Sequence, residues 1–288
     1  MRILVTGSTG QVGRAFIVAA PPWAQIHAVT HAVLDIGDAG AVDSCVEASR
    51  PDVIVNAAAY TAVDRAESEP DAARRVNAEG PANLARAAAR IGSRLLHLST
   101  DFVFDGQSSC PYQPDSPTNP LSVYGVTKLG GEVAVRELLP DRSVILRTAW
   151  VYDSQGRNFL LTMLRLMRER DMVRVVADQV GTPTAARSIA EVLWGIAGRP
   201  DIKGVHHWTD SGVASWYDFA VAIAEEWAHR SSAAVARVMP IGTADYPTPA
   251  KRPRFSVLDK SATSAALSLT PPHWRENLRQ VIGEIAVA

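Results

Sequence analysis

Short apolar runs alternate with amphipathic stretches over the first 150 residues of the chain. Runs rich in β-branched and other apolar residues predict buried strands, and apolar residues that recur every three to four positions predict helices. The predicted strands span residues 2–6, 26–30 and 52–56, a run that ends with 95–98, and residues 143–148. The predicted helices span residues 11–19 and 70–91, and a third runs from 122 towards 139. This alternation predicts an α/β fold with a Rossmann-type, doubly wound parallel sheet.

The order of elements changes after residue 150. Helices are predicted at 159–170, 188–197 and 216–229 and from 274 onward, with short strands at 173–177, 205–208 and 235–239. The strand at 205–208 is expected to return to the main sheet. A second, smaller lobe, built mainly from the C-terminal part of the chain, is therefore expected beside the sheet.

Charge and cysteine content exclude several classes of protein. The 288 residues carry a formal net charge of −1 without a block of like charges, so neither nucleic acid nor a membrane surface is an expected partner. The apolar runs are too short to span a bilayer, and no signal peptide pattern follows Met1. Cys45 and Cys110 are expected to be free thiols, and a cytoplasmic protein is predicted. His206 and His207 have no partners at metal-ligand spacing and are expected to be strand residues.

The first predicted strand leads directly into a glycine-rich turn. Gly7, Gly10 and Gly13 stand between this strand and the first helix. Glycine permits a tight turn and a close approach of the backbone to a pyrophosphate, whose charge meets the positive end of the helix. The G-x-x-G-x-x-G spacing departs from the G-x-G-x-x-G fingerprint, but its place after the first strand predicts a dinucleotide-binding turn.

The end of the second predicted strand bears on the choice of cofactor. Thr30 and His31 stand where an acid would bind the ribose 2′-hydroxyl and repel a 2′-phosphate. No arginine is obvious as a partner for that phosphate either. NADPH is therefore favoured as the cofactor, and NADH stays possible. Small residues at 57–59, after the third strand, suit a flat cofactor, although tight helix–sheet packing would explain them too.

A possible catalytic pair follows the fourth predicted strand. Thr100 and Asp101 lie where that strand ends, which is where open α/β sheets bind ligands. Tyr124 and Lys128 are one helical turn apart, so the ammonium is expected to lower the phenol pKa from about 10 and suit Tyr124 to general acid–base catalysis. Thr100 would polarise a carbonyl oxygen. Tyr-x-x-x-Lys alone is more often structural, so this hypothesis depends on the upstream glycine turn.

Several motifs occur in a recognisable order. After the glycine turn come NAAAYTAVD at 56–64, STDFVFDG at 99–106, the Tyr124–Lys128 pair, RTAWVY at 147–152 and DQVGTPT at 178–184. Together they resemble the dTDP-4-dehydrorhamnose reductase family, within the extended short-chain dehydrogenase/reductase superfamily, over nearly the whole chain. The resemblance implies NAD(P)H-dependent reduction of the 4-keto group of dTDP-4-dehydro-L-rhamnose to dTDP-L-rhamnose.

The resemblance also implies roles for individual residues. Tyr124 would donate a proton to the C4 alkoxide, Lys128 would hold the nicotinamide ribose, and Thr100 would polarise the keto oxygen. The sugar would be bound by Asp101 and Trp150 together with Thr100 and Tyr124. Cofactor contacts are expected from Gly7, Gly10, Gln11, Val12, Gly13, Asp35, Ile36, Ala57, Ala58, Ala59, Tyr60, Thr61, Tyr124 and Lys128. Residues 1–150, with 185–208 returning to them, would bind the cofactor, and residues 151–184 and 209–288 would form the substrate lobe.

A metal is not expected. Some family members are described as dimers joined through Mg²⁺ by glutamates, one of them early in the first helix. Here that helix has Arg14, Ala15 and Phe16 and no acid, so that Glu191 alone is placed to match. A Mg²⁺-bridged dimer is therefore not expected, and the chain is predicted to be a monomer or a weak homodimer.

Other functions fit parts of the pattern. A reductase of another dTDP-deoxysugar is one, because the Ala- and Arg-rich composition is typical of GC-rich bacteria that make such sugars. A dehydratase would need a glutamate where this chain has Phe102, and an epimerase would not consume its cofactor. A non-catalytic, NADP-binding regulatory subunit, like the partner of methionine adenosyltransferase, resembles the same reductases.

Overall fold

A computed structural model describes residues 1–231 and 236–286 of the chain. At its centre is a six-stranded sheet with the order β10-β5-β4-β3-β1-β2, in which all neighbours are parallel. Its strands are β1 (Arg2–Thr6), β2 (Gln25–Val29), β3 (Val53–Asn56), β4 (Arg94–Thr100), β5 (Ser143–Thr148) and β10 (Gly204–His207). The inner strands are nearly continuous apolar runs because helices cover both of their faces. The predicted doubly wound sheet is confirmed, and so is the return of the 205–208 region to it.

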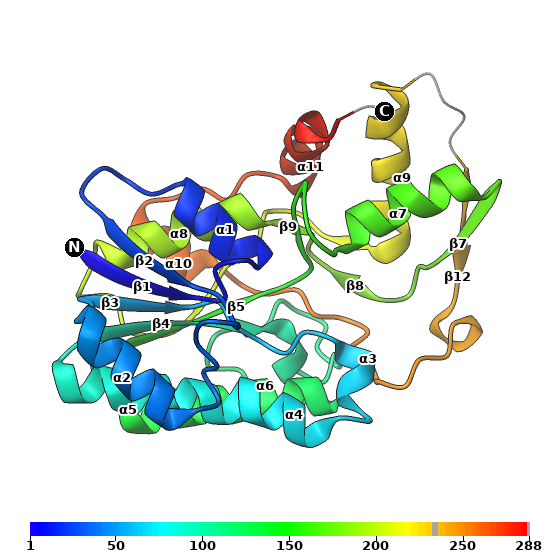
Figure 1. Ribbon diagram of the computed structural model, residues 1–288. Helices are drawn as coiled ribbons and strands as arrows, with labels where there is room; N and C mark the ends of the chain where they lie inside the picture. Colours follow the sequence, from blue (N-terminus) through cyan, green and yellow to red (C-terminus); the bar gives the residue numbers. More distant parts are fainter. Residues whose placement is uncertain (232–235, 287–288) are drawn as a thin grey trace.

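Helices form a layer on each side of the sheet (Figure 1). One layer holds α1 (Gln11–Val18), α8 (Ala186–Ala197) and α10 (Ser261–Leu267). The other holds α2 (Ala39–Ser49), α4 (Pro70–Arg74), α5 (Gly80–Ile91) and α6 (Val123–Leu138), with the short α3 (Val63–Ala66) beside them. In the first layer the Phe16 and Trp194 rings stack with centroids 4.0 Å apart, which joins α1 to α8. The predicted helix start at Ser122 is confirmed, because its Oγ accepts a hydrogen bond from Gly125 N.

The predicted helix over 70–91 forms with one irregularity. Between α4 and α5 lies a π-helical segment, η1 (Arg75–Glu79), which contains the buried Asn77. The Asn77 side chain accepts a hydrogen bond from Tyr60 N at 2.8 Å and donates one to Tyr60 O at 3.0 Å. It also donates to Thr127 Oγ1 on α6, at 3.2 Å. The widened turn therefore joins α6 to the chain segment that follows β3.

The remaining elements form a smaller lobe, seen beside the sheet in Figure 1. Its helices are α7 (Phe159–Glu169), α9 (Trp216–Ala228) and α11 (Trp274–Glu284), and its longer strands are β7 (Met172–Val176) and β12 (Arg237–Ile241), which pair in parallel. Its short strands are β6 (Val151–Tyr152), β8 (Val180–Gly181), β9 (Thr184–Ala185) and β11 (Ala214–Ser215), and it contains the 3₁₀ turn η3 (Thr243–Asp245). Another 3₁₀ turn, η2 (Asp101–Val103), follows β4 at the edge of the central sheet. Of the strand predicted at 235–239, residue 235 lies outside the described residues.

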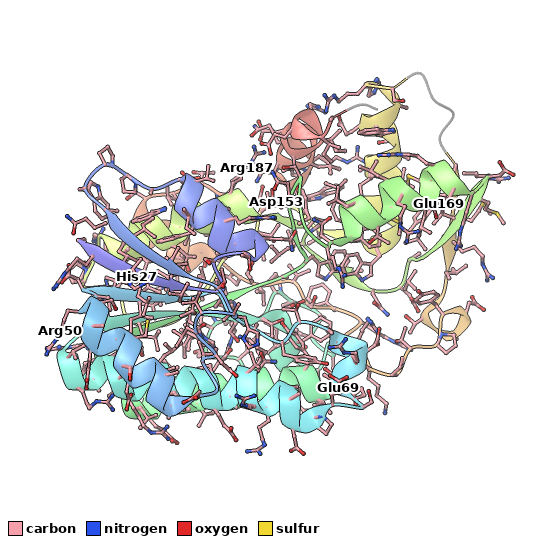
Figure 2. The ribbon with its side chains drawn as sticks, viewed as in Figure 1. His27, Arg50, Glu69, Asp153, Glu169 and Arg187 are labelled. Atoms are coloured by element: carbon pink, nitrogen blue, oxygen red, sulfur yellow. The ribbon has the colours of Figure 1, made fainter. Side chains whose placement is uncertain are left out.

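Side chains connect this lobe to the sheet layers. Figure 2 shows Asp153 and Arg187 at their junction. Asp153 lies 3.7 Å from the guanidinium of Arg14 on α1, and Arg187 on α8 donates to the carbonyl of Asn277 on α11 at 3.1 Å. Within residues 1–231 and 236–286, no helix combines the length and the apolar character that a membrane span requires.

Candidate active site

The glycine turn packs directly against the segment that follows β3. Gly7 has a φ of +69°, and a Cβ there would lie 2.5 Å from Ala58 N. A Cβ on Gly13 would lie 2.3 Å from Gly7 O. Gly10 is the N-cap of α1, and it leaves the first N–H groups of this helix without a side-chain cap. The turn is therefore as tight as its sequence predicts, and the positive end of α1 is open to an anion.

The side chains of Asn56 and His97 stabilise the same region by hydrogen bonds. No role was predicted for either residue from the sequence. Asn56 Oδ1 accepts hydrogen bonds from Thr6 Oγ1 at 2.7 Å and from Ala58 N at 3.1 Å. Its Nδ2 therefore faces His97 Nδ1, at 3.0 Å. Burial and the charge of Lys128 hold the pKa of His97 well below its usual value. Asn56, with a neutral imidazole that accepts at Nδ1, thus joins the ends of β1 and β3 to the middle of β4.

The residues expected at the adenine end of a cofactor lie apart from the catalytic pair. The carboxylate of Asp35 pairs with the guanidinium of Arg75, which belongs to η1. Ile36 is buried in the core, where a Cβ on Gly80 would lie 2.6 Å from its Cδ1. In the sequence, no arginine stands near the second strand as a partner for a 2′-phosphate. The structure brings Arg75 to this end from 40 positions further along the chain.

Other expected cofactor residues are already engaged by neighbours. Gln11, at the start of α1, accepts a hydrogen bond on Oε1 from Asn158 Nδ2 at 2.8 Å, and Val12 packs on the sheet core. Tyr60 donates its hydroxyl proton to Glu69 at 2.6 Å, so this ring belongs to a polar cluster near the surface. Thr61 follows it and is exposed.

Thr100, Asp101 and Tyr124 meet at the carboxyl end of β4. Thr100 Oγ1 donates to Asp101 Oδ1 at 3.0 Å and accepts from Phe102 N at 3.2 Å. The Tyr124 ring, in the first turn of α6, meets the Phe102 ring edge-on with centroids 5.5 Å apart. The Thr100 hydroxyl is also close enough to the Tyr124 phenol to lower its pKa. The structure thus brings together three of the four residues that were predicted to contact the substrate.

The predicted effect of Lys128 on Tyr124 is contradicted. Burial raises the pKa of the Tyr124 phenol to about 12, the charge of Asp101 adds to this, and the Thr100 hydrogen bond opposes it. Lys128 points into the core and donates from Nζ to Leu98 O at 2.6 Å. Burial lowers the pKa of Lys128 to about 8, against the effect of the Glu132 charge. In this arrangement the desolvation of the phenol outweighs any help from the ammonium.

Asp101 is the second group at the carboxyl end of β4 whose pKa is shifted. Burial raises its pKa to about 6, while hydrogen bonds with Ser256 and Thr100 oppose the shift. Its Oδ2 is buried and has no hydrogen-bond partner within the described part of the chain. The same holds for Oγ1 of Thr148, which lies opposite Thr100 in the register of β4 and β5. Unpaired buried polar atoms at a strand edge are suited to contact a ligand.

A buried ion pair supports this edge of the sheet. It was not predicted from the sequence. Arg147 of β5 makes two hydrogen bonds to the Glu132 carboxylate on α6, at 2.9 and 2.7 Å. Ser99 donates to the same carboxylate at 2.5 Å. Both charged side chains are almost fully buried. The spacing of Tyr124, Lys128 and Glu132 along one helix face was the signal available in the sequence.

Trp150 lies between the sheet and the smaller lobe. Its backbone has a φ of +49°, and its ring stacks on Trp216 with centroids 3.5 Å apart. Among the other predicted residues, His206 and His207 are in β10 as expected, and Glu191 is exposed on α8. Over the described ranges, no three His, Cys, Asp or Glu side chains are grouped as metal ligands.

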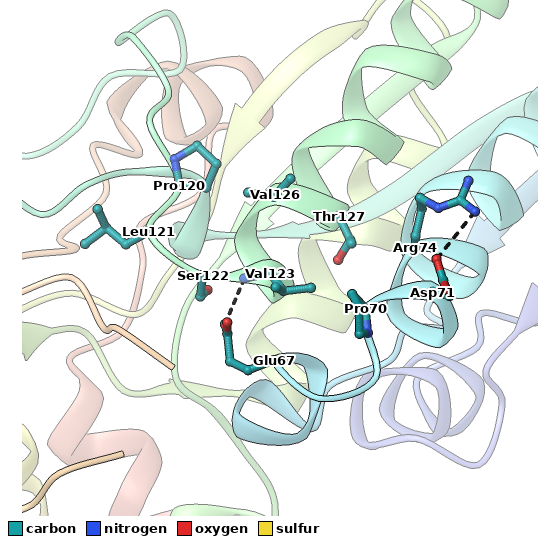
Figure 3. A pocket seen from close by; sticks show the side chains of 10 residues that line it. All are labelled: Glu67, Pro70, Asp71, Arg74, Pro120, Leu121, Ser122, Val123, Val126 and Thr127. Atoms are coloured by element: carbon teal, nitrogen blue, oxygen red, sulfur yellow. Dashed lines mark hydrogen bonds and ion pairs between the residues drawn. The ribbon is translucent and has the colours of Figure 1, made fainter. Parts of the chain in front are cut away.

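A pocket of about 430 Å³ lies elsewhere, between α4 and the start of α6 (Figure 3). Glu67 accepts a hydrogen bond from Val123 N across it, at 2.9 Å. Thr127, Val126 and Arg74 also line it. None of the predicted catalytic residues does. We therefore locate the site by the strand ends and their unpaired polar atoms, and not by this pocket.

Comparison with known proteins shows the family of the chain. The family model of the RmlD substrate binding domain matches residues 1–287. A dTDP-4-dehydrorhamnose reductase of Burkholderia thailandensis is 44% identical over 286 residues, which cover 96% of each chain. A crystal structure of the Clostridium acetobutylicum dTDP-4-dehydrorhamnose reductase has a TM-score of 0.92 and 38% identity, covering 98% of this chain and 99% of that one. The Bacillus anthracis dTDP-4-dehydrorhamnose reductase in complex with NADP has a TM-score of 0.93 and 33% identity, with the same coverage. The predicted resemblance is confirmed: this chain belongs to the RmlD substrate binding domain family, together with the dTDP-4-dehydrorhamnose reductases.

Proposed function

We propose that the chain reduces the 4-keto group of dTDP-4-dehydro-L-rhamnose to give dTDP-L-rhamnose, with NADPH as the hydride donor and NADH as a possible substitute. The observation that carries the proposal is the meeting of Thr100, Asp101 and Tyr124 at the end of β4. The names of the relatives and the NADP of the Bacillus anthracis structure support the same reaction.

The turn after β1 fits a dinucleotide. The uncapped N–H groups of α1 suit a diphosphate, and its first turn contains no acid that would repel one. Ala57 and Ala58 approach Gly7 so closely that only backbone and small side chains face the turn. NADPH, when bound, would supply the hydride that the carbonyl carbon receives.

Tyr124 would supply the proton. A pKa of about 12 keeps the phenol protonated at neutral pH, so it is ready to donate to the C4 oxygen as negative charge develops there. The Thr100 hydroxyl, next to the phenol, would turn its single proton from Asp101 Oδ1 to that oxygen and so give it a second hydrogen bond. Lys128 keeps two N–H groups beyond the one directed at Leu98 O, and these would bind the nicotinamide ribose.

The division of labour between the two parts follows from the same arrangement. We assign cofactor binding to residues 1–150 with 185–208, and sugar binding to residues 151–184 and 209–288 together with the strand edge. Asp101 and Trp150 would contact the hexose. Phe102 occupies the place of a dehydratase glutamate and packs on Tyr124, so no carboxylate stands there to remove a C5 proton.

The test is an assay of reduced nicotinamide consumption. NADPH and NADH are each supplied with dTDP-4-dehydrorhamnose made in situ, and the sugar product is identified by mass spectrometry and NMR. Loss of cofactor matched by formation of dTDP-L-rhamnose is the expected result, faster with NADPH. Cofactor binding without oxidation would contradict the proposal and favour a regulatory subunit. If NADPH or NADH is oxidised only with another 4-keto sugar nucleotide, the proposed type of reaction stands and the proposed substrate is wrong.

A further inference from the structure

Trp150 has a backbone conformation that large side chains seldom adopt. Its φ of +49° lies in the left-handed region, where a bulky non-glycine residue is an outlier. Such a conformation persists only where the surrounding structure determines it, and it is concentrated at ligand sites. Trp150 stands two residues beyond the end of β5, next to the strand edge that carries Thr100 and Thr148. The features that hold this conformation therefore bear on function.

Two neighbours hold the indole of Trp150. The Trp216 ring lies parallel to it, with centroids 3.5 Å apart and planes 4° from parallel. Gly181 borders it so closely that a Cβ there would lie 2.6 Å from Trp150 Cε2. In addition, the Trp150 carbonyl accepts a hydrogen bond from Thr184 N at 3.2 Å. The Trp216 ring, Gly181 and the backbone hydrogen bond together fix the conformation of the Trp150 side chain.

Both neighbours are themselves fixed. Gly181 belongs to β8, which pairs with β11 so that Gly181 lies opposite Ala214. Trp216 follows β11 directly and begins α9, whose first turn is held by a capping box between Ser215 and Asp218. The spacing between glycine and ring is thus set by backbone pairing and not by flexible side chains.

The same strand also leads to the catalytic edge. Val180 O, next to Gly181 in β8, accepts a hydrogen bond from Ser256 N at 2.8 Å. The Ser256 side chain is in turn close enough to the carboxyl group of Asp101 to lower its pKa. Gly181, which borders Trp150, is therefore the neighbour in β8 of the residue that binds the backbone of Ser256.

One polar group of this arrangement is left free. The indole N–H of Trp150 has no hydrogen-bond partner among the described residues, and the ring is only partly buried. Indole combines an apolar face, which packs on the C–H groups of a sugar, with one donor for a hydroxyl. A fixed indole with a free donor is therefore suited to orient a hexose.

We propose that Trp216 and Gly181 are positioning residues that hold the indole of Trp150 against the hexose of the nucleotide sugar. The proposal rests on the proposed function. It adds that sugar recognition depends on a stacked tryptophan pair of which only one member touches the ligand. Selection among hexoses then depends on how rigidly Trp150 is held, since a small displacement of a contact group weakens binding and orientation.

The test compares Trp216→Leu, which removes the stack, with Trp216→Phe, which keeps an aromatic ring there. Stacked aromatic pairs contribute enough that Trp216→Leu is expected to raise KM for the nucleotide sugar and the Kd of dTDP-L-rhamnose by roughly 2- to 10-fold. In Trp216→Phe, most of this increase in KM and Kd should be absent. The Kd of NADPH should be unchanged in both variants. Gly181→Ala should raise KM like Trp216→Leu, because its Cβ displaces the indole.

Circular dichroism follows the stack itself. Two parallel indoles in contact give an exciton couplet in the far-ultraviolet spectrum, which should disappear in Trp216→Leu and in Trp150→Phe alike. Loss of the couplet with unchanged KM and unchanged Kd for dTDP-L-rhamnose would overturn the proposal. A parallel fall in melting temperature, NADPH affinity and kcat would also overturn it, because that pattern indicates a purely structural role. Absence of turnover in the unmodified protein would instead contradict the proposed function, while the binding of dTDP-L-rhamnose still tests the stack.

Discussion

Burial sets the protonation of the residues at the end of β4. It raises the pKa of Tyr124 to about 12 and that of Asp101 to about 6, and it lowers that of Lys128 to about 8. The sequence predicts which of these residues come together, because strand ends and helix starts follow from local patterns. It does not predict the direction of the Tyr124 shift, because desolvation depends on every element that packs around the phenol.

Removal of the Tyr124 hydroxyl should affect the chemical step alone. Tyr124→Phe keeps the ring that packs on Phe102 and deletes the proton donor, so kcat should fall about 10²–10⁴-fold. The Kd of NADPH, measured by fluorescence titration, should stay within about twofold of the original value. Near-normal turnover of this variant would exclude Tyr124 as the donor. A loss of cofactor affinity equal to the loss of rate would point to a structural effect.

Asp101 should make stability depend on pH. Its pKa in the folded protein, about 6, lies above the value of about 3.9 of an unfolded chain, so the folded state binds the proton more tightly. Its contribution to stability is therefore present below about pH 4 and is lost as the pH rises through 6. Asp101→Asn removes this cost, so its melting temperature relative to the original protein should be higher at pH 8 than at pH 4, while its activity falls. A difference in melting temperature that does not change with pH would contradict the buried carboxylate.

At the scale of elements, the apolar runs predicted the strands of the central sheet. The reason is physical: β3, β4 and β5 are buried on both faces, so apolar residues fill most of the central positions of each strand. The π-helical turn at Asn77 was not predictable. It depends on the backbone of Tyr60, which belongs to another segment, and the periodicity of the helix over 70–91 carries no trace of it.

The contact between α6 and this turn predicts unequal effects for two adjacent glycines. A Cβ on Gly131 would lie 2.2 Å from Asn77 O, whereas on Gly130 the nearest neighbour is Ala78 Cβ at 3.2 Å. Gly131→Ala should therefore lower the free energy of unfolding by about 1–3 kcal/mol through overpacking. Gly130→Ala serves as the matched control. Its free energy of unfolding should change little, because the higher helix propensity of alanine offsets the milder contact of the new Cβ with Ala78. Urea denaturation measures both, and equal midpoints would show that α6 does not pack on the π-helical turn as described.

At the scale of the whole molecule, the half of the site that lies at the sheet edge could be placed from the sequence, and the half that the smaller lobe contributes could not. The glycine turn and the segment after β3 each follow a strand in sequence, so their places at the sheet edge follow from the fold class. Trp216, Gly181 and Ser256 come from distant parts of the chain and reach the edge only through the packing of the smaller lobe. Periodicity and local motifs do not encode such long-range neighbours.

One ion pair joins these halves across the site. Arg252, in the C-terminal segment, donates to both oxygens of the Asp64 carboxylate, at 3.0 and 2.8 Å. Hydrogen bonding to Arg252 lowers the pKa of Asp64, so the pair is charged at neutral pH. Asp64 follows the segment at 57–61 that we assign to the cofactor, and Arg252 precedes Ser256, which holds Asp101. The ion pair therefore joins the segment assigned to the cofactor to the C-terminal segment, and we expect it to contribute to coupling between the two ligands.

The coupling can be measured as the factor by which NADP changes the Kd of dTDP-L-rhamnose, and by linkage the sugar nucleotide must change the Kd of NADP by the same factor. Asp64→Asn keeps the shape of the side chain and removes its charge, so this factor should move towards one. The change should be at most about fivefold, because the pair is partly exposed and such pairs contribute about 0.2–1 kcal/mol. Arg252→Lys, which keeps the charge but loses the planar two-bond contact, should give a smaller change in the same direction. If calorimetry finds the same factor in the original protein and in Asp64→Asn, the ion pair holds the loop in place without transmitting anything between the two ligands.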